Sequence, residues 1–586
     1  MRVVTLNLIP DDPEISRAWN GLVAQMERPE IFFTYEWALA ASRAFREFLR
    51  PMLFLLYDSD ELSGVAALAT NLQSPASVFF LTSTTADYCD VVSFPQKRKD
   101  VLGSLFEELK RLHIRKLTLA NVPFDSCTFH ELPSAAKPHD FHFSSRAAYD
   151  CRIIEFGDNQ QREALLRSVS RKEREKRGLN KLRALGRIGL VHVVTPECGQ
   201  QSLESIISSQ VARFLASERE SPLIRPERRA FLRELTDLLG RAGWLRISQL
   251  EVNSEPIAWN YGFRYGSGWF WYLPTYRVER EDASPGSCLL RLLVEEAAGD
   301  LTLRRLDLGL GDESYKERFG NNVQQTRYVE LSQSLTRHVL GISRNVMTSV
   351  GAQHPRAKRI LVEPRDKFRR LRDRGRKAGW IATSGYLFRK AIETVASKRE
   401  VVFFEAGAIE PIRDSNIALL PLTWEHLARA AIRCAEDPDT LQYLMRSAAR
   451  LKRGTNSGFV LQQQPEQTVH FLWVGRYDGF HLAEIDQTLT SDCSSAVLIF
   501  DCWTPAMDRG HGHYTTAIRL VAEKLTRQGC RPWIFAATNN VSSLRGIVKA
   551  GFQYRFHLVR RKGLGYSSKV TRLDSVLAAI ATARSR

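Results

Sequence analysis

Two glycines near residue 510 could present main-chain N–H groups to an anion. The segment Arg509-Gly510-His511-Gly512-His513 follows an apolar run of strand length, 495–503, and precedes a stretch in which apolar residues recur at helical spacing. Glycine permits backbone conformations that other residues avoid, so successive amides can converge on one anion. The positive end of the following helix dipole would face the same loop. This pattern predicts the binding of a pyrophosphate.

Other interpretations of the glycine segment remain open. A Walker A phosphate loop requires a lysine after its last glycine, and the dinucleotide-binding fingerprint requires a small residue where Thr515 stands. Neither pattern is met. Alternatively, the two glycines only turn the chain from a strand into a helix.

A second motif follows at a spacing that makes the pattern more specific. Asn540-Val541-Ser542-Ser543 and Lys549-Ala550-Gly551-Phe552 come after a predicted strand and bracket a short predicted helix. Together with Arg509-x-x-Gly512, they resemble the cofactor motifs of the GNAT superfamily of N-acetyltransferases. The resemblance implies that the main chain from Arg509 to His513 holds the pyrophosphate of an acyl-CoA. It also implies further cofactor contacts from three residues: Trp503, Asn540 and Ser543.

The same segment departs from the GNAT pattern at two positions. Tyr514 stands where the pattern prefers glycine or alanine, which implies a tighter loop. Ile547 stands where many members carry a tyrosine that protonates the leaving thiolate. These departures favour an alternative in which the C-terminal segment binds CoA without turning it over.

A second resemblance covers residues 1–335. Ser284-Pro285-Gly286-Ser287 opens an amphipathic stretch, and the chain continues through an apolar strand at 303–308 into Gly309-Leu310-Gly311-Asp312-Glu313-Ser314-Tyr315-Lys316. This order is similar to that of CelD-type polysaccharide-biosynthesis proteins, relatives of the Fem-type peptidoglycan aminoacyltransferases. Supporting pieces are Phe33-Thr34-Tyr35-Glu36-Trp37, Asp87-Tyr88 and the basic stretch around Ser170-Arg171-Lys172. The resemblance implies two acetyltransferase-like folds in tandem, the first of them degenerate.

The Ser-Pro-Gly-Ser segment predicts the start of a helix that could bind a small anion. Pro285 presets the turn, Gly286 allows close backbone approach, and Ser287 can cap the first-turn amides. The cofactor-binding candidates in this segment are therefore Ser284, Gly286 and Ser287. An ordinary capped helix is the alternative.

Polar residues near strand ends are candidates for acid–base work or acceptor binding. Asp307 and Lys316 flank the end of the apolar strand, with Tyr315 beside them, and a solvated salt bridge is the alternative. In the C-terminal part, Glu484 lies in a predicted strand, 480–487, and could take a proton from an amine or hydroxyl acceptor. The alternative for Glu484 is a surface position on that strand.

The basic charge of the chain indicates anionic partners. The formal net charge is +18 and the pI is about 9.6. Much of the excess lies in 167–187 and 356–377, where no aromatic residues interleave at a spacing that would stack bases, so a sequence-reading nucleic-acid module is not indicated. The remaining partners are the phosphates of CoA, a diphosphate-linked sugar, an acidic membrane face or a charged tRNA, and solvated helix faces are the alternative.

Composition indicates an ordinary globular protein of several domains. The 586 residues are 44% hydrophobic and 25% charged, and the chain has neither a run of about 18 apolar residues nor an apolar signal segment at its start. We therefore expect a cytoplasmic protein without a transmembrane segment. The nine cysteines include no Cys-x-x-Cys pair, which argues against a disulfide framework and against a zinc site, so no metal is predicted.

The two resemblances together imply a mixed α/β (α+β) protein of tandem acetyltransferase-like folds, each a mixed sheet flanked by helices. The predicted domains are a degenerate fold at 1–150, a CelD-type fold at 151–335, a basic helical connector at 336–400 and a GNAT-like fold at 401–575. The predicted function is acyl-CoA-dependent transfer of an acetyl or longer acyl group to an amino group of a sugar, glycan or peptide, in surface-polysaccharide or cell-envelope biosynthesis. Two alternatives remain: a non-catalytic protein that binds CoA or a glycan, and a Fem-like aminoacyltransferase that uses aminoacyl-tRNA.

Overall fold

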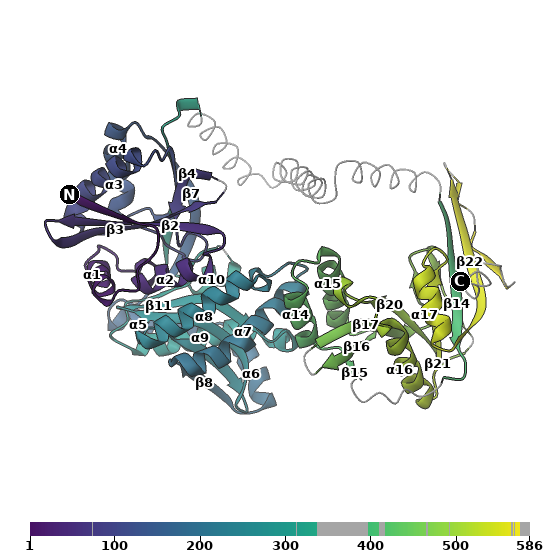
Figure 1. Cartoon of the computed structure of the whole chain (residues 1–586). Coiled ribbons are helices and arrows are strands. Elements are labelled where there is room, and N and C mark those ends of the chain that lie inside the picture. Colours follow the sequence, from purple (N-terminus) through teal and green to yellow (C-terminus); the bar gives the residue numbers. More distant parts are fainter. Residues whose placement is uncertain are drawn as a thin grey trace. The chain divides into compact units, whose positions relative to one another are not determined.

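The computed structural model describes residues 1–336, except 73 and 312, and residues 397–574, except 410–416, 465–466, 492, 564–565 and 568. The chain forms two compact units (Figure 1). The first unit comprises residues 1–213 and 225–357, and the second comprises residues 214–224 and 358–586. The connector predicted at 336–400 lies outside the described residues apart from its two ends, and its last residues already belong to a strand that starts at Ser397.

A mixed sheet of 13 strands runs through the described part of the first unit. Its spatial order is β1 (Arg2–Leu6), β2 (Leu49–Asp58), β3 (Glu61–Asn71), β4 (Ser74–Phe80), β6 (Lys116–Pro123), β13 (Asn322–Ser332), β7 (His142–Glu155), β12 (Arg305–Asp307), β11 (Gly268–Tyr276), β10 (Glu255–Tyr265), β9 (Ile247–Val252) and β8 (Ile188–Val193), with β5 (Val92–Ser93) pairing β3.

The α-helices of the first unit cross between these strands. They are α1 (Pro13–Ala24), α2 (Tyr35–Ala44), α3 (Arg98–Arg111), α4 (Cys127–Ala136), α5 (Asn159–Ser170), α6 (Glu173–Leu185), α7 (Pro196–Ala216), α8 (Pro226–Arg241), α9 (Pro285–Gly299) and α10 (Ser314–Phe319). Among the described residues, none of the helices in either unit is both long enough and apolar enough to cross a lipid bilayer.

The strands β11 and β12 are parallel neighbours that separate part-way along β11. Their pairing runs from Gly268 and Arg305 to Phe270 and Asp307, whereas β11 continues to Tyr276. A parallel pair needs a crossover, and α9 supplies it. Helix α9 is held in place because Leu289, Leu290, Leu293 and Val294 recur at helical spacing and are fully buried in the core. The two strands therefore part at the end of β12, where β11 continues without a pairing partner on that side among the described residues.

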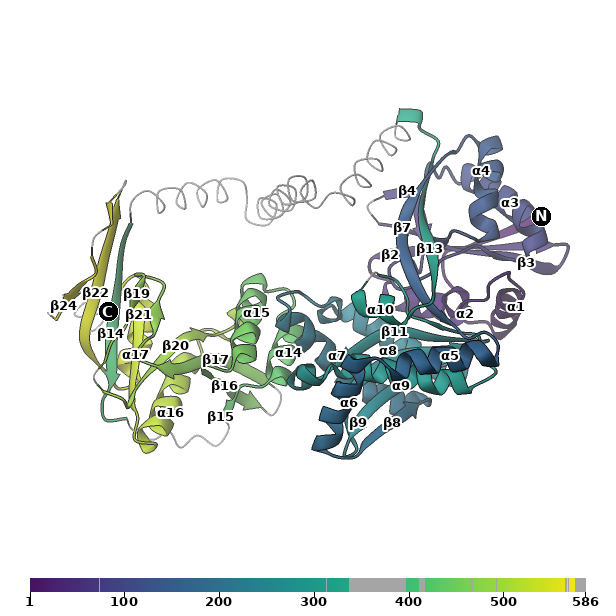
Figure 2. The same ribbon diagram turned by 180° about the vertical axis from the view of Figure 1, so that it is seen from behind.

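The two halves of the first unit share one sheet. Figure 2 shows β13 beside β7, and β13 also pairs with β6 of the N-terminal half. The boundary expected at residue 150 falls inside β7, which pairs with β12 as well as with β13. The division of residues 1–335 into two domains stays a prediction. The mixed α/β class with mixed sheets flanked by helices is confirmed.

The second unit is built on a second mixed sheet. Nine strands are found in its described part, in the spatial order β15 (Ala418–Pro421), β16 (Ser457–Gln464), β17 (Gln467–Arg476), β20 (Ala496–Trp503), β21 (Arg531–Ala537), β14 (Ser397–Ala406), β22 (Phe552–Gly563) and β23 (Tyr566–Ser567), with β24 (Thr571–Leu573) pairing β22. Its helices are α14 (Trp424–Arg433), α15 (Pro438–Arg453), α16 (His513–Arg527) and α17 (Val541–Lys549).

The order of elements around the glycine loop agrees with the sequence pattern. Strand β20 leads through the loop into α16, β21 follows as a parallel neighbour of β20, and α17 comes next. The apolar face predicted for the helix is confirmed, because Ala517, Ile518 and Val521 are fully buried in the core.

The strand predicted at 480–487 is wrong. The structure has a hairpin of two short strands, β18 (His481–Leu482) and β19 (Gln487–Thr488), with Glu484 in the turn between them. Leu482 and Ile485 are both fully buried although they are three residues apart. A strand with one face on the core buries every second residue, so the burial of both side chains agrees with the turn found at 483–486.

Candidate functional site

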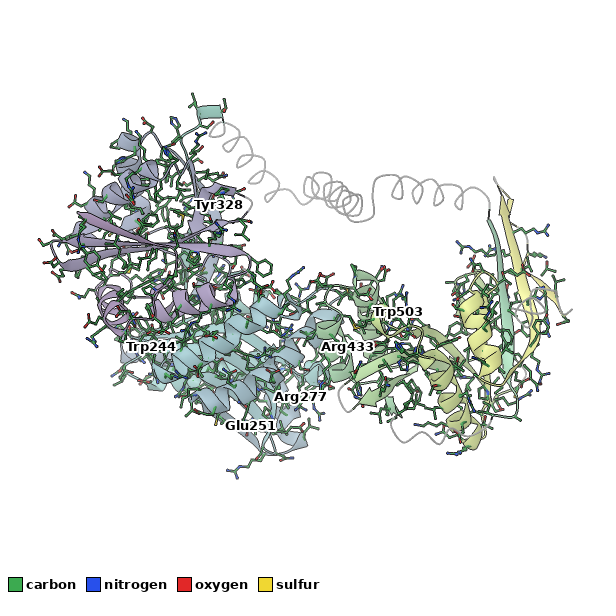
Figure 3. All side chains as sticks on the ribbon, viewed as in Figure 1. Trp244, Glu251, Arg277, Tyr328, Arg433 and Trp503 are labelled. Atoms are coloured by element: carbon green, nitrogen blue, oxygen red, sulfur yellow. The ribbon has the colours of Figure 1, made fainter. Side chains whose placement is uncertain are left out.

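A pocket of about 600 Å³ lies in the first unit, where β11 and β12 have separated. It is lined by Tyr272 and Leu273 of β11, which follow the last residue paired with β12, and by Leu310, which follows β12. Residues 83–87 and strands β6, β7 and β13 complete the wall, and Figure 3 labels one wall residue, Tyr328. A volume of this size suits a small molecule, since ligand pockets measure about 300–1,000 Å³.

The carboxylate of Asp87 is the titratable group in this pocket with a pKa near neutrality. Burial and, after it, the negative charge of Asp307 raise the pKa of Asp87 to about 7. The Lys316 ammonium group and a hydrogen bond from the Leu310 main chain oppose this rise in the pKa. A carboxyl group with such a pKa can accept and release a proton at neutral pH.

Contacts from several elements hold the loop that carries Asp87. The Tyr272 hydroxyl of β11 donates to the Thr85 carbonyl at 2.6 Å, and Asn121 Nδ2 of β6 donates to the Ala86 carbonyl at 3.0 Å. The Cys89 N–H donates to the Asn121 carbonyl at 3.0 Å. The loop is thus fixed from both halves of the unit, which orients the carboxylate before any ligand binds.

Gly309 allows the main chain to approach Asp87 closely. It has a φ of +70°, and a Cβ atom added to it would lie 2.5 Å from Asp87 Oδ2 and 3.6 Å from the Trp271 carbonyl oxygen. Side chains other than glycine rarely adopt this φ, and 2.5 Å is shorter than any normal contact of a Cβ atom. The glycine therefore sets the position of the carboxylate next to the end of β12.

The three polar residues predicted at this strand end lie behind the pocket and do not line it. Asp307 is buried and accepts hydrogen bonds from the Tyr88 hydroxyl and the Gly309 N–H, both at 2.9 Å. Lys316 is buried, donates to the Leu310 carbonyl and lies 2.9 Å from Glu313. The Tyr315 hydroxyl accepts a hydrogen bond from Trp271 Nε1 at 3.1 Å, and burial raises the pKa of Tyr315 to about 12. Asp312, from the same motif, lies outside the described residues.

The helix predicted after Ser-Pro-Gly-Ser is present, but its cap differs from the prediction. Helix α9 starts at Pro285, and the residue before it, Ser284, has a left-handed φ of +49° and makes no side-chain capping bond. The prediction that Ser287 caps the helix is wrong, because Ser287 already lies inside the first turn. Ser284 Oγ instead accepts a hydrogen bond from Arg174 Nε at 3.2 Å, and Gly286 lies against the Tyr276 ring at the end of β11.

The second unit has its own pair of diverging parallel strands. Pairing between β20 and β21 ends at Ile499 and Ile534, although β20 continues to Trp503. Asp501 has a φ of +47°, and the register between β17 and β20 shifts at this point, so β20 carries a bulge where the strands part.

The glycine loop follows at the end of β20 and is open. Gly510 and Gly512 have φ values of +88° and +78°, and a Cβ atom added to either would meet nothing within 4 Å. No side chain caps the first turn of α16. The main-chain N–H groups of this turn therefore remain without a side-chain acceptor, as an anion-binding loop requires.

Neighbouring side chains fasten this loop to the sheet. Arg433 of α14 donates two hydrogen bonds to the buried Asp508 carboxylate and one to the Thr468 carbonyl. Arg509 Nε donates to the Thr504 carbonyl at 3.1 Å, and the Arg509 guanidinium lies 5.3 Å from the ring of Trp503. Figure 3 labels Arg433 and Trp503 in this unit.

The two histidines of the loop stack on each other. Their rings, from His511 and His513, are 5.6 Å apart with an interplanar angle of 27°. Sequence reasoning missed a third histidine, His470 of β17, whose Nδ1 lies 2.8 Å from Thr504 Oγ1. Burial lowers the pKa of His470 to about 3, and its Nε2 has no hydrogen-bond partner among the described residues.

The second sequence motif lies next to the first turn of α16. Asn540 is the N-cap of α17, and its Oδ1 accepts a hydrogen bond from the Ser543 N–H at 3.2 Å. The Ser543 side chain hydrogen-bonds to Tyr514, whose ring packs against Gly546. Ile547 is fully buried in the core. Glu484, in its hairpin turn, is exposed, and its carbonyl accepts a hydrogen bond from Arg399.

Sequence reasoning also missed Asp87 and Arg146 as pocket residues. The Asp87-Tyr88 pair was used only to support a family resemblance, and the sequence of the strand that carries Arg146 contains no motif. Nothing in the local sequence distinguishes Arg146 from the many other arginines of the chain.

Comparison with known proteins gives a family for part of the first unit. Residues 170–317 match the sequence model of the Acetyltransferase (GNAT) domain, Acetyltransf_6. No match was found among curated proteins.

Several solved structures are similar to somewhat more than half of this chain, all at low sequence identity. FemX is 10% identical, with a TM-score of 0.41, and the match covers 58% of this chain and 99% of that chain. L-PGS from Bacillus licheniformis is 10% identical, with a TM-score of 0.32, and 54% and 96% of the two chains are covered. A tandem GNAT protein from the clavulanic acid biosynthesis pathway is 11% identical, with a TM-score of 0.32 and coverage of 56% and 98%.

The match at residues 170–317 contains α9, β11, β12 and the Asp307 to Lys316 segment, which are the elements that form the opening in the sheet. Residues 170–317, within the first unit, are therefore similar in sequence to an acetyltransferase domain of the GNAT superfamily.

Proposed function

We propose that this protein is an acyl-CoA-dependent N-acyltransferase whose reaction takes place in the pocket of the first unit. The GNAT domain match at 170–317 supports acyl transfer in general. The observation that carries the proposal is the carboxyl group of Asp87, whose pKa is raised to about 7, in a pocket at the point where β11 and β12 separate. The acceptor is an amino group on a sugar, glycan or peptide used in surface-polysaccharide or cell-envelope biosynthesis.

The acyl-CoA lies along the outer end of β11. The first turn of α9 has no side-chain cap, so its main-chain N–H groups and the positive end of its dipole are suited to the pyrophosphate. Ser284 and Gly286 form the approach to this turn, with the Arg174 guanidinium 3.2 Å from Ser284 Oγ. The thioester then reaches the gap between β11 and β12.

Asp87 acts as the general base in this proposal. It takes one proton from the protonated amine (–NH3+) of the acceptor, and the neutral nitrogen that results then forms a bond to the thioester carbonyl carbon. The carbonyl oxygen gains negative charge, which main-chain N–H groups at the open edge of β11 can stabilise. The carbon–sulfur bond breaks, the thiolate leaves with the second amine proton, and Asp87 releases its proton to water. The products are an amide and free CoA.

Asp307, Lys316 and Tyr315 support this base from behind. Asp307 accepts a hydrogen bond from the Gly309 N–H, and Lys316 donates one to the Leu310 carbonyl. Both bonds fix the segment that contacts Asp87. The Tyr315 hydroxyl accepts a hydrogen bond from the Trp271 side chain of β11. We propose that all three position the acceptor site without touching the reacting atoms.

The second unit binds an acyl-CoA at its own glycine loop in this proposal. The amides from Arg509 to His513 would hold the pyrophosphate, Trp503 would lie beside the pantetheine arm, and Asn540 and Ser543 would lie toward the thioester. The open space at Gly510 and Gly512 supports this assignment. Ile547 offers no hydroxyl group to protonate a thiolate, so we propose binding here, with the role of Glu484 as a base left as a prediction.

The proposed function is tested by thiol release. The full-length protein is incubated with acetyl-CoA and amine acceptors, and free CoA is measured with a thiol reagent. Thermal unfolding with acetyl-CoA and, separately, with uncharged tRNA shows which ligand the folded state prefers. Stabilisation by tRNA alone, with no thiol release for any amine, would contradict the proposal.

Because acyl-CoA is made and used in the cytoplasm, we propose that this protein is located there.

Replacing Gly512 with alanine should remove the acyl-CoA site of the second unit. The new side chain would enter the open space where the anion is expected, and the φ of +78° is strained for alanine. Isothermal titration calorimetry of the full-length protein should fall from two acetyl-CoA sites to one. The matched control is Gly529→Ala, since Gly529 has a φ of +80° and the same open space but lies at the other end of α16. Two sites in both variants would speak against the loop.

A further inference from the structure

We infer that the pocket of the first unit selects an acceptor that carries a phosphate or carboxylate group in addition to its amine, and that Arg146 binds this anionic group. The inference rests on the proposed function only in placing the amine at Asp87. It adds the substrate class: amines of small anionic molecules, in preference to neutral amines.

Arg146 is held in the pocket wall by its neighbour on the next strand. Arg146 of β7 and Tyr328 of β13 are register partners, so their side chains lie on the same face of the sheet. The guanidinium lies 4.2 Å from the centroid of the Tyr328 ring. This cation–π contact keeps the guanidinium plane against the ring and leaves its edge available to a ligand.

The guanidinium of Arg146 has no carboxylate partner among the described residues. The contact that the structure gives its nitrogen atoms is a long hydrogen bond, 3.4 Å, to the carbonyl of the adjacent Ala147. By contrast, Arg152 on the same strand pairs with Glu317 at 3.2 Å. A half-buried guanidinium without a counter-ion has a fork of donors suited to the two oxygens of a carboxylate or phosphate.

The pocket carries one charge of each sign. Of the described residues that line it, Asp87 is the sole carboxylate and Arg146 the sole cation. A ligand that satisfies both groups has an ammonium group at one end and an anion at the other. A neutral amine would leave Arg146 without a counter-ion, and an anion without an amine would place nothing beside Asp87.

The remaining wall suits a compact ring with hydroxyl groups. Tyr149, Tyr272 and Tyr328 contribute aromatic rings, while Ser83, Thr84 and Asn121 contribute hydrogen-bonding side chains. The Tyr272 hydroxyl already donates to Thr85, so its ring is the part that faces a ligand. A single charged amino sugar fits a volume of about 600 Å³.

Three probes that share one amino-sugar ring and differ in the group at C6 test the inference: glucosamine with a hydroxyl group, glucosamine 6-phosphate, and 2-amino-2-deoxyglucuronate with a carboxylate. Binding to the full-length protein is measured by calorimetry at low ionic strength, and CoA release is measured for each probe as acceptor. We expect one or both anionic probes to bind about 10- to 100-fold more tightly than glucosamine, as a hydrogen-bonded charge pair predicts. The tighter of the two identifies phosphate or carboxylate as the preferred group.

The variant Arg146→Gln should abolish this preference, so that the anionic probes bind no more tightly than glucosamine. Arg146→Lys, which keeps the charge but loses the fork, should retain part of it. The control is Arg152→Gln, on the same strand and outside the pocket, which should behave as the wild type. Thermal unfolding of each variant shows that it is folded.

Failure of this inference differs from failure of the proposed function. Equal binding of all three probes, no binding of any, or a preference that survives in a folded Arg146→Gln protein would overturn the inference. Equal CoA release with glucosamine and its 6-phosphate would leave the acyltransferase standing and remove the anion preference. An anion preference in binding without any CoA release would leave Arg146 as the anion site and remove the acyltransferase.

Discussion

Replacing Asp87 with asparagine is expected to lower kcat by about 10²- to 10⁴-fold, the usual contribution of a general base. Asparagine has nearly the same shape, so it keeps the contact with Leu310 but cannot accept the proton of the amine. The rate of CoA release with the preferred amine acceptor measures the effect. The control is Asp60→Asn in the β2–β3 turn, where the side chain is exposed, and it should leave the rate unchanged.

The pH dependence of the wild type should report the same group. Because burial raises the pKa of Asp87 to about 7, kcat/KM is expected to rise with pH through about 7 and to level off above it, as the ionised base forms. The Asp87→Asn protein should lack this titration. A wild-type profile that is flat between pH 6 and about 8 would be inconsistent with Asp87 as the base.

As the pH rises, the contribution of Asp87 to folding stability should fall while the activity rises. The folded-state pKa of Asp87 is raised above its unfolded value, so its contribution to stability is fully present below the unfolded pKa, about 4, and is lost as pH rises through about 7. Asparagine does not titrate. The Asp87→Asn protein should therefore have a higher Tm than the wild type at pH 8 and a similar one near pH 4. A lower Tm at pH 8 would mean that the carboxylate is stabilised by its partners.

Replacing Gly309 with alanine is expected to lower kcat by about 100-fold, the effect of displacing a catalytic group by roughly 1 Å. The new Cβ atom would lie 2.5 Å from Asp87 Oδ2, so the carboxylate must move away from the end of β12. The positive φ of +70° adds a backbone cost of about 1–2 kcal/mol. CoA release and urea unfolding of the same protein separate the two effects.

Gly243→Ala provides the matched control for the backbone cost. Gly243 has a φ of +73°, but a Cβ atom added there meets nothing within 4 Å. Both variants should lose stability to a similar degree, whereas only Gly309→Ala should lose activity. Equal activity in the two variants would show that the position of the Asp87 carboxylate does not depend on Gly309.

Some elements of the fold could be predicted from the sequence because they depend on residues close together in the chain. The strand, glycine loop and helix around Gly510 follow from an apolar run, two glycines and the helical spacing of Ala517, Ile518 and Val521. Each of these signals depends on neighbours within a few residues. The same reasoning failed for Ser287 and Glu484, where a helix began earlier than expected and a strand turned into a hairpin.

The position and lining of the pocket depend on the tertiary structure alone. Asp87 and Leu310 meet because the Asp87 loop is held from β6 and β11, and Arg146 meets Tyr328 because β7 and β13 are neighbours in the sheet. Local sequence fixes which face of an element is apolar, but not which distant element covers it. The pKa of Asp87 depends on that covering, since desolvation and the charge of Asp307 both arise from segments far away in the chain. The sequence by itself therefore determined where an anion-binding loop could form, and the packed sheet determined where an acid–base group near neutrality lies.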